Sequence, residues 1–163
     1  MSNVVILCVE DEAEVRDAII RDLEPFQQHF RIECVEDVNE AREVVADLQK
    51  EGDVLGLILC DHVLPGTTGV DFMVEMNHNP LYSSLRKVLL TGQAGHEDTI
   101  KAINEGHVNH YVAKPWRAAD LQAVVRNELT EFVIETSDDL MPYVAILDSA
   151  KLLDAISQRG ADT

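Results

Sequence analysis

Five short apolar runs alternate with longer amphipathic segments along this chain. The runs cover residues 4–9, 31–35, 55–60, 87–90 and 110–112. Short apolar runs bounded by turn residues are typical of strands that are buried on both faces of a parallel sheet. The segments between them have helical spacing and cover residues 14–23, 37–49, 70–77, 97–104 and 118–135. Strands alternating with helices in this way predict right-handed βαβ units, and therefore an α/β domain with helices on both faces of its sheet.

The segment 37–49 carries the strongest helix pattern. Asp37 can cap its first turn, and Glu40 follows three residues later as in a capping box. The apolar stripe of this helix consists of Val38, Ala41, Val45 and Leu48.

The apolar pattern does not stop where a compact five-unit domain would end. The chain of 163 residues is long enough for one domain of roughly 120–130 residues and an appendage. We therefore divide it into a domain at 1–129 and a helical extension at 130–163. A break is expected near 137–139, because Pro142 fits best in a first helical turn. A second amphipathic segment then follows, with Leu140, Tyr143, Leu147, Ala150, Leu153 and Ile156 at spacings of three and four.

This second segment approaches the seam of a coiled coil, although it covers few heptads. Three interpretations of residues 130–163 stay open. The segment packs back on its own domain, forms a homodimer contact, or begins a linker to an effector.

The net charge of −17 narrows the choice of partners. Such an acidic chain gains nothing by releasing counterions from a phosphate backbone, which disfavours direct binding of nucleic acid. Solubility alone is the ordinary alternative explanation for the charge. No run approaches the ~20 apolar residues of a membrane span, and the start lacks a basic region followed by an apolar one. We therefore expect no membrane insertion and a cytoplasmic location.

Three cysteines, Cys8, Cys34 and Cys60, all fall in predicted strands. An odd number of widely spaced cysteines without an export signal indicates reduced thiols in the core.

Polar residues stand where four of the five apolar runs end. Glu10 and Asp11 follow the first run, Asp61 the third, Thr91 the fourth, and Lys114 the fifth. In open α/β sheets, ligands bind outside the carboxyl ends of the strands. The sequence therefore predicts that three carboxylates, one hydroxyl and one ammonium meet at a single edge.

That set of groups suits phosphoryl transfer. Asp61 is the natural nucleophile, since carboxylates form covalent aspartyl-phosphate intermediates. Clustered carboxylates repel each other unless they share a cation, and Mg²⁺, with Mn²⁺ as the alternative, prefers such hard oxygen ligands. Lys114 and Thr91 supply donors to phosphoryl oxygens. Taken singly, each residue is explained as a helix cap, a turn or a loop residue, but their joint placement favours a site.

These residues resemble the motifs of the receiver domain of two-component response regulators. The matching segments are 9–12, 59–66 with Gly69 following, 90–92 and 113–116, and the resemblance covers about residues 3–129. It implies the flavodoxin-like, chemotaxis-regulator-like fold, which is a doubly wound five-stranded parallel sheet in the order 2-1-3-4-5.

The resemblance also implies a role for each residue of the cluster. Asp61 would accept a phosphoryl group from a phosphohistidine on a sensor histidine kinase or a phosphotransfer protein. Glu10, Asp11, Asp61 and the backbone carbonyl of Val63 would hold Mg²⁺. Thr91 would assist at the phosphoryl group together with Lys114.

Two further features are implied by the same resemblance. Thr91 and Tyr111 match the switch pair, in which the threonine moves toward the phosphoryl group and the aromatic ring turns inward. This change alters the face made by the fourth helix, fifth strand and fifth helix. The bond between Lys114 and Pro115 is expected to be cis, which aims the lysine inward.

The chain departs from the family pattern at a few positions. Glu10 replaces the commoner aspartate of the acid pair, which leaves metal binding intact. Val63 cannot orient an attacking water, whereas Gln93 could, so the phosphoryl lifetime stays open. Trp116 places an indole near the output face.

The histidines are interpreted as surface or packing residues. Strand alternation points His62 away from the nucleophile Asp61. The other histidines show no metal-ligand spacing.

The sequence therefore predicts a phosphorylation-controlled switch that signals by binding a downstream protein or a fused effector, and not an enzyme with a metabolite substrate. One alternative is the N-terminal regulatory receiver of a larger effector enzyme. Another is a pseudo-receiver that works without phosphorylation, against which the intact Asp61, Thr91 and Lys114 argue. A haloacid-dehalogenase phosphatase is disfavoured because position 63 is valine.

Overall fold

The structure, a computed structural model, describes residues 3–92 and 96–161 and contains a five-stranded parallel sheet. The strands are hydrogen-bonded in the order β2-β1-β3-β4-β5, which confirms the predicted fold class. They are β1 (Val4–Val9), β2 (Arg31–Val35), β3 (Val54–Cys60), β4 (Arg86–Thr91) and β5 (His110–Ala113).

The helices lie close to the predicted segments and differ by a few residues at their ends. They are α1 (Ala13–Asp22), α2 (Val38–Glu51), α3 (Gly69–Asn77), α4 (His96–Asn104), α5 (Ala118–Thr136) and α6 (Ser149–Ala161). The 3₁₀ turns η1 (Glu24–Phe26), η2 (Pro80–Tyr82) and η3 (Met141–Tyr143) were not predicted. A proline occupies one of the first positions of each of these turns, where its missing N–H costs nothing.

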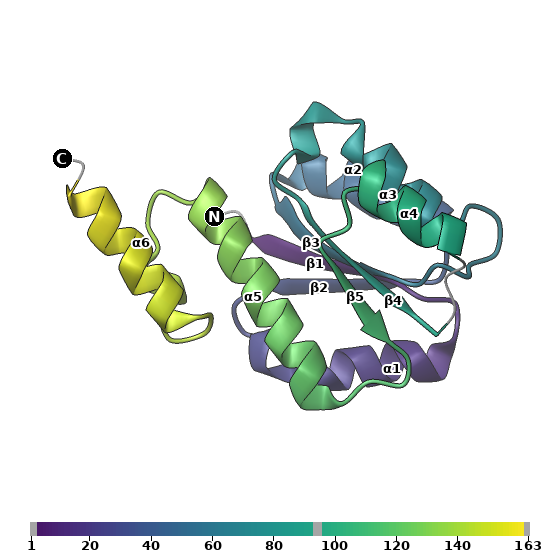
Figure 1. Ribbon diagram of the computed structural model, residues 1–163, viewed down its shortest axis with the longest axis horizontal. Helices are drawn as coiled ribbons and strands as arrows, with labels where there is room; N and C mark the ends of the chain where they lie inside the picture. Colours follow the sequence, from purple (N-terminus) through teal and green to yellow (C-terminus); the bar gives the residue numbers. More distant parts are fainter. Residues whose placement is uncertain (1–2, 93–95, 162–163) are drawn as a thin grey trace.

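Two layers of helices enclose the sheet, with α1 and α5 on one face and α2, α3 and α4 on the other (Figure 1). Side chains alternate along β1, so that Ile6 packs in the cluster with α1 and α5 while Leu7 packs in the cluster with α2 and α3. The three central strands β1, β3 and β4 are therefore largely buried, whereas the edge strands β2 and β5 are partly exposed.

Asp37 caps α2 as the sequence predicts, because its carboxylate accepts a hydrogen bond from the Glu40 amide at 2.8 Å. The reciprocal bond of the capping box is displaced by one residue, since the Glu40 carboxylate accepts from the Glu36 amide at 3.0 Å. Gly52 then ends the helix in the left-handed region, with φ of 78°.

The C-terminal extension differs from the expected amphipathic helix. The break after α5 is present, but η3 and a turn separate it from α6, which begins only at Ser149. Asp148 accounts for this start, since its carboxylate accepts from the Lys151 amide at 3.2 Å and its own amide donates to Thr130 Oγ1 at 3.1 Å. The interruption shifts the buried stripe, so that Leu152 is buried and the predicted seam residue Leu153 is 51% exposed.

The extension contacts α5 and the α1 side of the same chain. The rings of Phe30 and Tyr143 stack with their centroids 6.0 Å apart, and Leu140 and Leu147 join the core cluster of α1 and α5. These contacts are those of a segment packed on its own domain, while the division of the chain at residue 129 stays a prediction. Within the described residues, no helix has the length and apolar character to cross a membrane.

Lys87 on β4 is a charged residue inside the core, with only 3% of its surface exposed. Its strand neighbour on β3 is Ile58, and the alternation of β4 places it on the same face as the buried Leu89. Loss of hydration, together with the neighbouring charge of Arg86, lowers the pKa of Lys87 to about 8.

We expect Lys87→Met to stabilise the protein by about 1–3 kcal/mol at pH 7, because it removes a poorly hydrated ammonium group. The unfolded chain holds this proton up to its ordinary pKa of about 10.4, whereas the folded protein releases it from about pH 8. Wild-type stability should therefore rise with pH across this window, and the advantage of the variant should shrink.

Urea unfolding at pH 7.0 and 9.5 measures this change. The matched control is Lys50→Met, since Lys50 is an exposed lysine near the end of α2. A variant advantage that is equal at both pH values would show that Lys87 carries no buried charge.

Candidate functional site

The predicted cluster forms at the carboxyl ends of β1, β3 and β5. Backbone hydrogen bonds hold the two residues that follow β1 and β3. The Glu10 amide donates to the Val35 carbonyl at 3.0 Å, and the Asp61 amide donates to the Val9 carbonyl at 3.0 Å. Both carboxylates therefore extend from rigid strand ends and not from mobile loops.

The three predicted carboxylates come together. One oxygen each of Glu10, Asp11 and Asp61 lies within 4.8 Å of the others. Glu10 is fully buried and Asp61 is 6% exposed, whereas Asp11 faces solvent. The cluster is thus open on one side, and its hard oxygen donors fit a divalent cation such as Mg²⁺.

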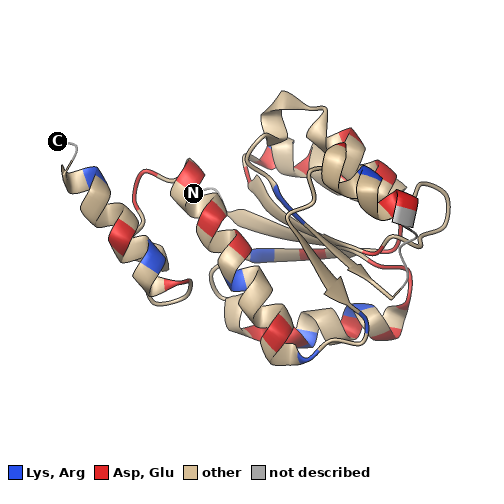
Figure 2. Ribbon diagram, in the orientation of Figure 1, with Lys and Arg blue, Asp and Glu red and all other residues tan. Residues whose placement is uncertain are grey.

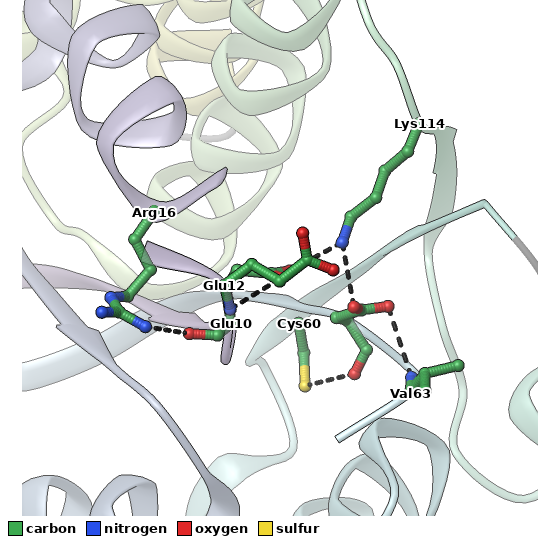
Figure 3. Close-up of polar contacts among 7 residues, drawn as sticks. Glu10, Glu12, Arg16, Cys60, Val63 and Lys114 are labelled. Atoms are coloured by element: carbon green, nitrogen blue, oxygen red, sulfur yellow. Dashed lines mark hydrogen bonds and ion pairs between the residues drawn. The ribbon is translucent and has the colours of Figure 1, made fainter. Parts of the chain in front are cut away.

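Lys114 supplies the positive charge of the cluster (Figure 3). Its ammonium nitrogen lies 2.8 Å from Glu10 Oε2 and 2.9 Å from Asp61 Oδ2, and it donates a hydrogen bond to each. The Lys114–Pro115 peptide bond is cis, as the resemblance implies.

Burial and this ion pairing shift the pKa values of Glu10 and Lys114. Burial raises the pKa of Glu10 and the charge of Asp61 adds to the rise, while Lys114 opposes it. Burial works against the charged form of Lys114, yet its hydrogen bonds to Glu10 and Asp61 raise its pKa. The lysine therefore stays charged, and it offsets the repulsion between the two carboxylates.

The loop after Asp61 is held against the start of α3. The Val63 amide donates to Asp61 Oδ1 at 3.3 Å, and the Gly69 amide donates to the His62 carbonyl at 3.0 Å. A Cβ atom at position 69 would lie 1.9 Å from the Asp61 carbonyl oxygen. Only glycine permits this approach, which explains the Gly69 that the sequence places at the start of α3.

Thr91 and Tyr111 lie on neighbouring strands, at the end of β4 and within β5. The Thr91 carbonyl accepts from the Lys114 amide at 3.4 Å, so the end of β4 is joined to the lysine of the cluster. The Tyr111 hydroxyl donates to the Thr99 carbonyl of α4 at 3.2 Å. These contacts connect the cluster to α4 through β4 and β5. Gln93, considered above as an orienting residue for water, lies outside the described residues.

Several contacts around the cluster were not predicted. Arg16 of α1 donates to the Glu10 carbonyl at 2.8 Å, and His62 Nε2 lies 3.0 Å from an Asp98 carboxylate oxygen of α4. His62 is buried, so its interpretation as a packing residue agrees with the structure. No sequence pattern marks these pairs, because they join residues on different elements.

Trp116 lines a surface groove with Tyr111 of β5 and Val124 of α5, so it lies beside two elements of the expected output face. Its indole Nε1 donates to the buried carboxylate of Asp22 at 2.8 Å, which ties the loop after β5 to the end of α1. The tryptophan therefore fixes the position of the segment that carries Lys114.

A family model of the response regulator receiver domain matches residues 6–126. The chain therefore belongs to the response regulator receiver family, whose members are phosphorylation-based signalling domains that interact with histidine kinases and effectors.

Relatives among curated proteins support this assignment. The hydrogenase transcriptional regulatory protein HoxA of Cupriavidus necator is 31% identical over 121 residues, which are 74% of this chain and 23% of that protein. The phosphate regulon transcriptional regulatory protein PhoB of Escherichia coli is 30% identical over 125 residues, with 74% of this chain and 49% of that protein covered. The chain thus spans less than half the length of these relatives.

Solved structures show the same fold. A signal receiver domain of an HD domain-containing protein from Pseudomonas fluorescens has a TM-score of 0.73 at 23% identity, and the match covers 85% of this chain and 96% of that one. A CheY-like receiver domain from Methanospirillum hungatei has a TM-score of 0.69 at 25% identity, with 82% and 99% covered.

We expect Asp11→Asn to weaken Mg²⁺ binding by about tenfold or more, since it removes the exposed carboxylate of the cluster. Isothermal titration calorimetry with Mg²⁺ measures this loss. Asp17→Asn on the exposed face of α1 is the matched control and should bind like the wild type. Equal affinities of the Asp11→Asn variant and the wild type would exclude Asp11 as a ligand.

Proposed function

We propose that this chain is a phosphorylation-activated response regulator in which Asp61 accepts the phosphoryl group. The donor is a phosphohistidine on a sensor histidine kinase or a phosphotransfer protein. The observation that carries this proposal is the ammonium of Lys114, which lies within hydrogen-bond distance of both Glu10 and Asp61. A buried carboxylate beside a fixed cation at the open end of a sheet is suited to receive a phosphoryl group.

In the proposed transfer, an Asp61 carboxylate oxygen attacks the phosphorus atom of the donor. A new P–O bond forms as the P–N bond to the donor imidazole breaks, and the imidazole leaves with the electron pair. Lys114 exchanges its contact with the Asp61 carboxylate for a phosphoryl oxygen, and the Thr91 hydroxyl donates to another. Both residues stabilise the charge that spreads over the phosphoryl oxygens.

Glu10, Asp11, Asp61 and the backbone carbonyl of Val63 would hold Mg²⁺, or Mn²⁺ in its place. The donor set supports this assignment, because the three carboxylates converge and one of them faces solvent. When bound, the cation neutralises charge on the transferring phosphoryl group.

The signal would leave the site through Thr91 and Tyr111. Movement of Thr91 toward the phosphoryl group would make room for the Tyr111 ring to turn inward. This rotation would break the hydrogen bond from Tyr111 to the Thr99 carbonyl of α4. The face made by α4, β5 and α5 would then change and bind a downstream protein or a fused effector.

The charge of the chain supports a protein partner. Acidic residues occur along α1, α5 and α6 (Figure 2), and the net charge is −17. We propose that these residues make no direct contact with nucleic acid and that the chain works in the cytoplasm. We also propose that the chain can form a homodimer through residues 130–163.

One alternative has support from the comparisons. The chain spans 23% and 49% of the two transcriptional regulators to which it is similar, so those receivers belong to longer proteins. By analogy, the segment described here could be the regulatory part of a larger effector, with the same phosphorylation chemistry. A pseudo-receiver is the alternative that lacks this chemistry, and labelling at Asp61 separates it from the other two.

Incubation with acetyl phosphate and Mg²⁺ should add one phosphoryl group, about 80 Da, and Asp61→Asn should abolish the adduct because it removes the nucleophile. Intact-mass spectrometry measures both results, with a chelated sample as a further control. Asp47→Asn, at an exposed position of α2, should label like the wild type. An adduct that persists in Asp61→Asn would place the acceptor elsewhere.

We expect Lys114→Ala to retain Mg²⁺ binding but to lose the coupling between the phosphoryl group and α4, because the ammonium that would contact the phosphoryl group is then missing from the segment bonded to Thr91. Amide hydrogen exchange of α4 and β5, with and without acetyl phosphate, measures the coupling. In the wild type the exchange rates should change by about threefold or more on phosphorylation, and in the labelled fraction of the variant they should not. The same response in both proteins would exclude Lys114 as the link.

A further inference from the structure

Two of the three cysteines are neighbours across the sheet. Cys8 of β1 and Cys34 of β2 are partners in the parallel register, so their side chains lie on the same face. Adjacent strands are about 4.7–4.9 Å apart, which falls within the Cα separation of about 4.4–6.8 Å that disulfides span. From the sequence alone, these cysteines are predicted to be separate reduced thiols in the core.

The two thiols differ in their surroundings. Cys8 is fully buried, whereas Cys34 is half-buried and lines a surface groove of about 350 Å³ with Ile20, Gln27, Phe30, Arg31 and Ile32. Small solutes can therefore reach Cys34 from solvent, whereas Cys8 has no exposed surface.

The ionisation of the Cys34 thiol adds to this difference in access. A hydrogen bond with Cys8 lowers the pKa of the Cys34 thiol; burial opposes this, and the charge of Arg16 adds to the lowering. Because the thiolate is the nucleophile, the accessible cysteine of the pair is also the more reactive one.

We infer that Cys34 is an oxidation site for peroxides and that Cys8 converts the oxidised cysteine into an intramolecular disulfide. The Cys34 sulfur attacks one oxygen of hydrogen peroxide, the O–O bond breaks, and hydroxide leaves and is protonated to water. Cys34 is then a sulfenic acid. Cys8 gives up its proton, its sulfur attacks the Cys34 sulfur, and the S–O bond breaks to release a second water. Two thiols are oxidised and one peroxide is reduced.

Cys60 is excluded from this pair by its position. It lies in the core cluster on the opposite face of the sheet from Cys8, and its thiol donates to the Asp61 carbonyl at 3.2 Å. Its pKa is raised, mainly by burial. It therefore serves as an internal control for the chemistry of a buried thiol.

The disulfide would lie directly beneath the acidic cluster. Cys8 is two residues before Glu10, and Cys34 immediately precedes Val35, whose carbonyl accepts from the Glu10 amide at 3.0 Å. A bond between the two sulfurs constrains the strand ends that position Glu10. Oxidation is thereby coupled to divalent-cation binding, and this consequence, unlike the disulfide itself, rests on the proposed function.

Treatment of the reduced protein with hydrogen peroxide tests the disulfide. We expect an intact-mass loss of about 2 Da and, after proteolysis without reductant, a cross-linked peptide pair that contains Cys8 and Cys34. Cys60→Ala should give the same product, and Cys34→Ser should give none. Cys8→Ser should stop at a Cys34 sulfenic acid that dimedone traps.

Circular dichroism checks that each variant is folded. If Cys8→Ser does not fold, the absence of the disulfide product in Cys34→Ser is the result that tests the inference. A disulfide that includes Cys60, a bond between two chains, or over-oxidation of Cys34 without a cross-link would overturn the inference.

Calorimetric Mg²⁺ titration of the reduced and disulfide forms tests the coupling. We expect the Mg²⁺ affinity to change by about threefold or more. The disulfide would shift the strand ends that position Glu10, and the position of a metal ligand affects how tightly the cation is held. An unchanged affinity with the disulfide present would overturn the coupling alone. If the reduced protein itself binds no Mg²⁺, the proposed metal site fails independently of the disulfide.

Discussion

The ion pairing of Lys114 with Glu10 and Asp61 is the interaction on which the rest of the site depends. Two carboxylates with almost no solvent exposure lie side by side, and a buried charge that loses its partner typically costs about 3–5 kcal/mol. The ammonium of Lys114 contacts both and makes their burial tolerable. In the proposed transfer, the lysine would exchange its contact with Asp61 for an oxygen of the incoming phosphoryl group.

The fold supplies the rigidity that this balance requires. Glu10 and Asp61 are fixed by backbone bonds to neighbouring strands, and Trp116 holds the segment after β5 against α1 through Asp22. Gly69 allows α3 to begin in contact with the backbone of Asp61. On the other side of the site, His62 and Tyr111 make side-chain contacts with α4.

The region next to the site contains a second kind of chemistry. The register of β1 and β2 brings Cys8 and Cys34 together directly below Glu10, on the face covered by α1 and α5. The same segment of β1 therefore carries a thiol of the pair and is followed by two carboxylates of the acidic cluster. Strand pairing makes this proximity compulsory, since a one-residue shift would move each side chain to the opposite face.

The pattern of apolar runs determined the strands, the order of the elements and the edge where the functional residues meet, because burial on both faces leaves a strong local signal. The strand-end motifs likewise determined the family, and the sequence comparisons confirm it. The tertiary structure alone decided which charges are paired, since Lys114 and Glu10 lie 104 residues apart in the chain. It also decided the start of α6, where Thr130 and Asp148 override the amphipathic period, and the pairing of Cys8 with Cys34. Local sequence patterns reflect burial and helical period. Contacts between distant elements depend instead on how those elements pack, and their packing is fixed only when the whole chain has folded.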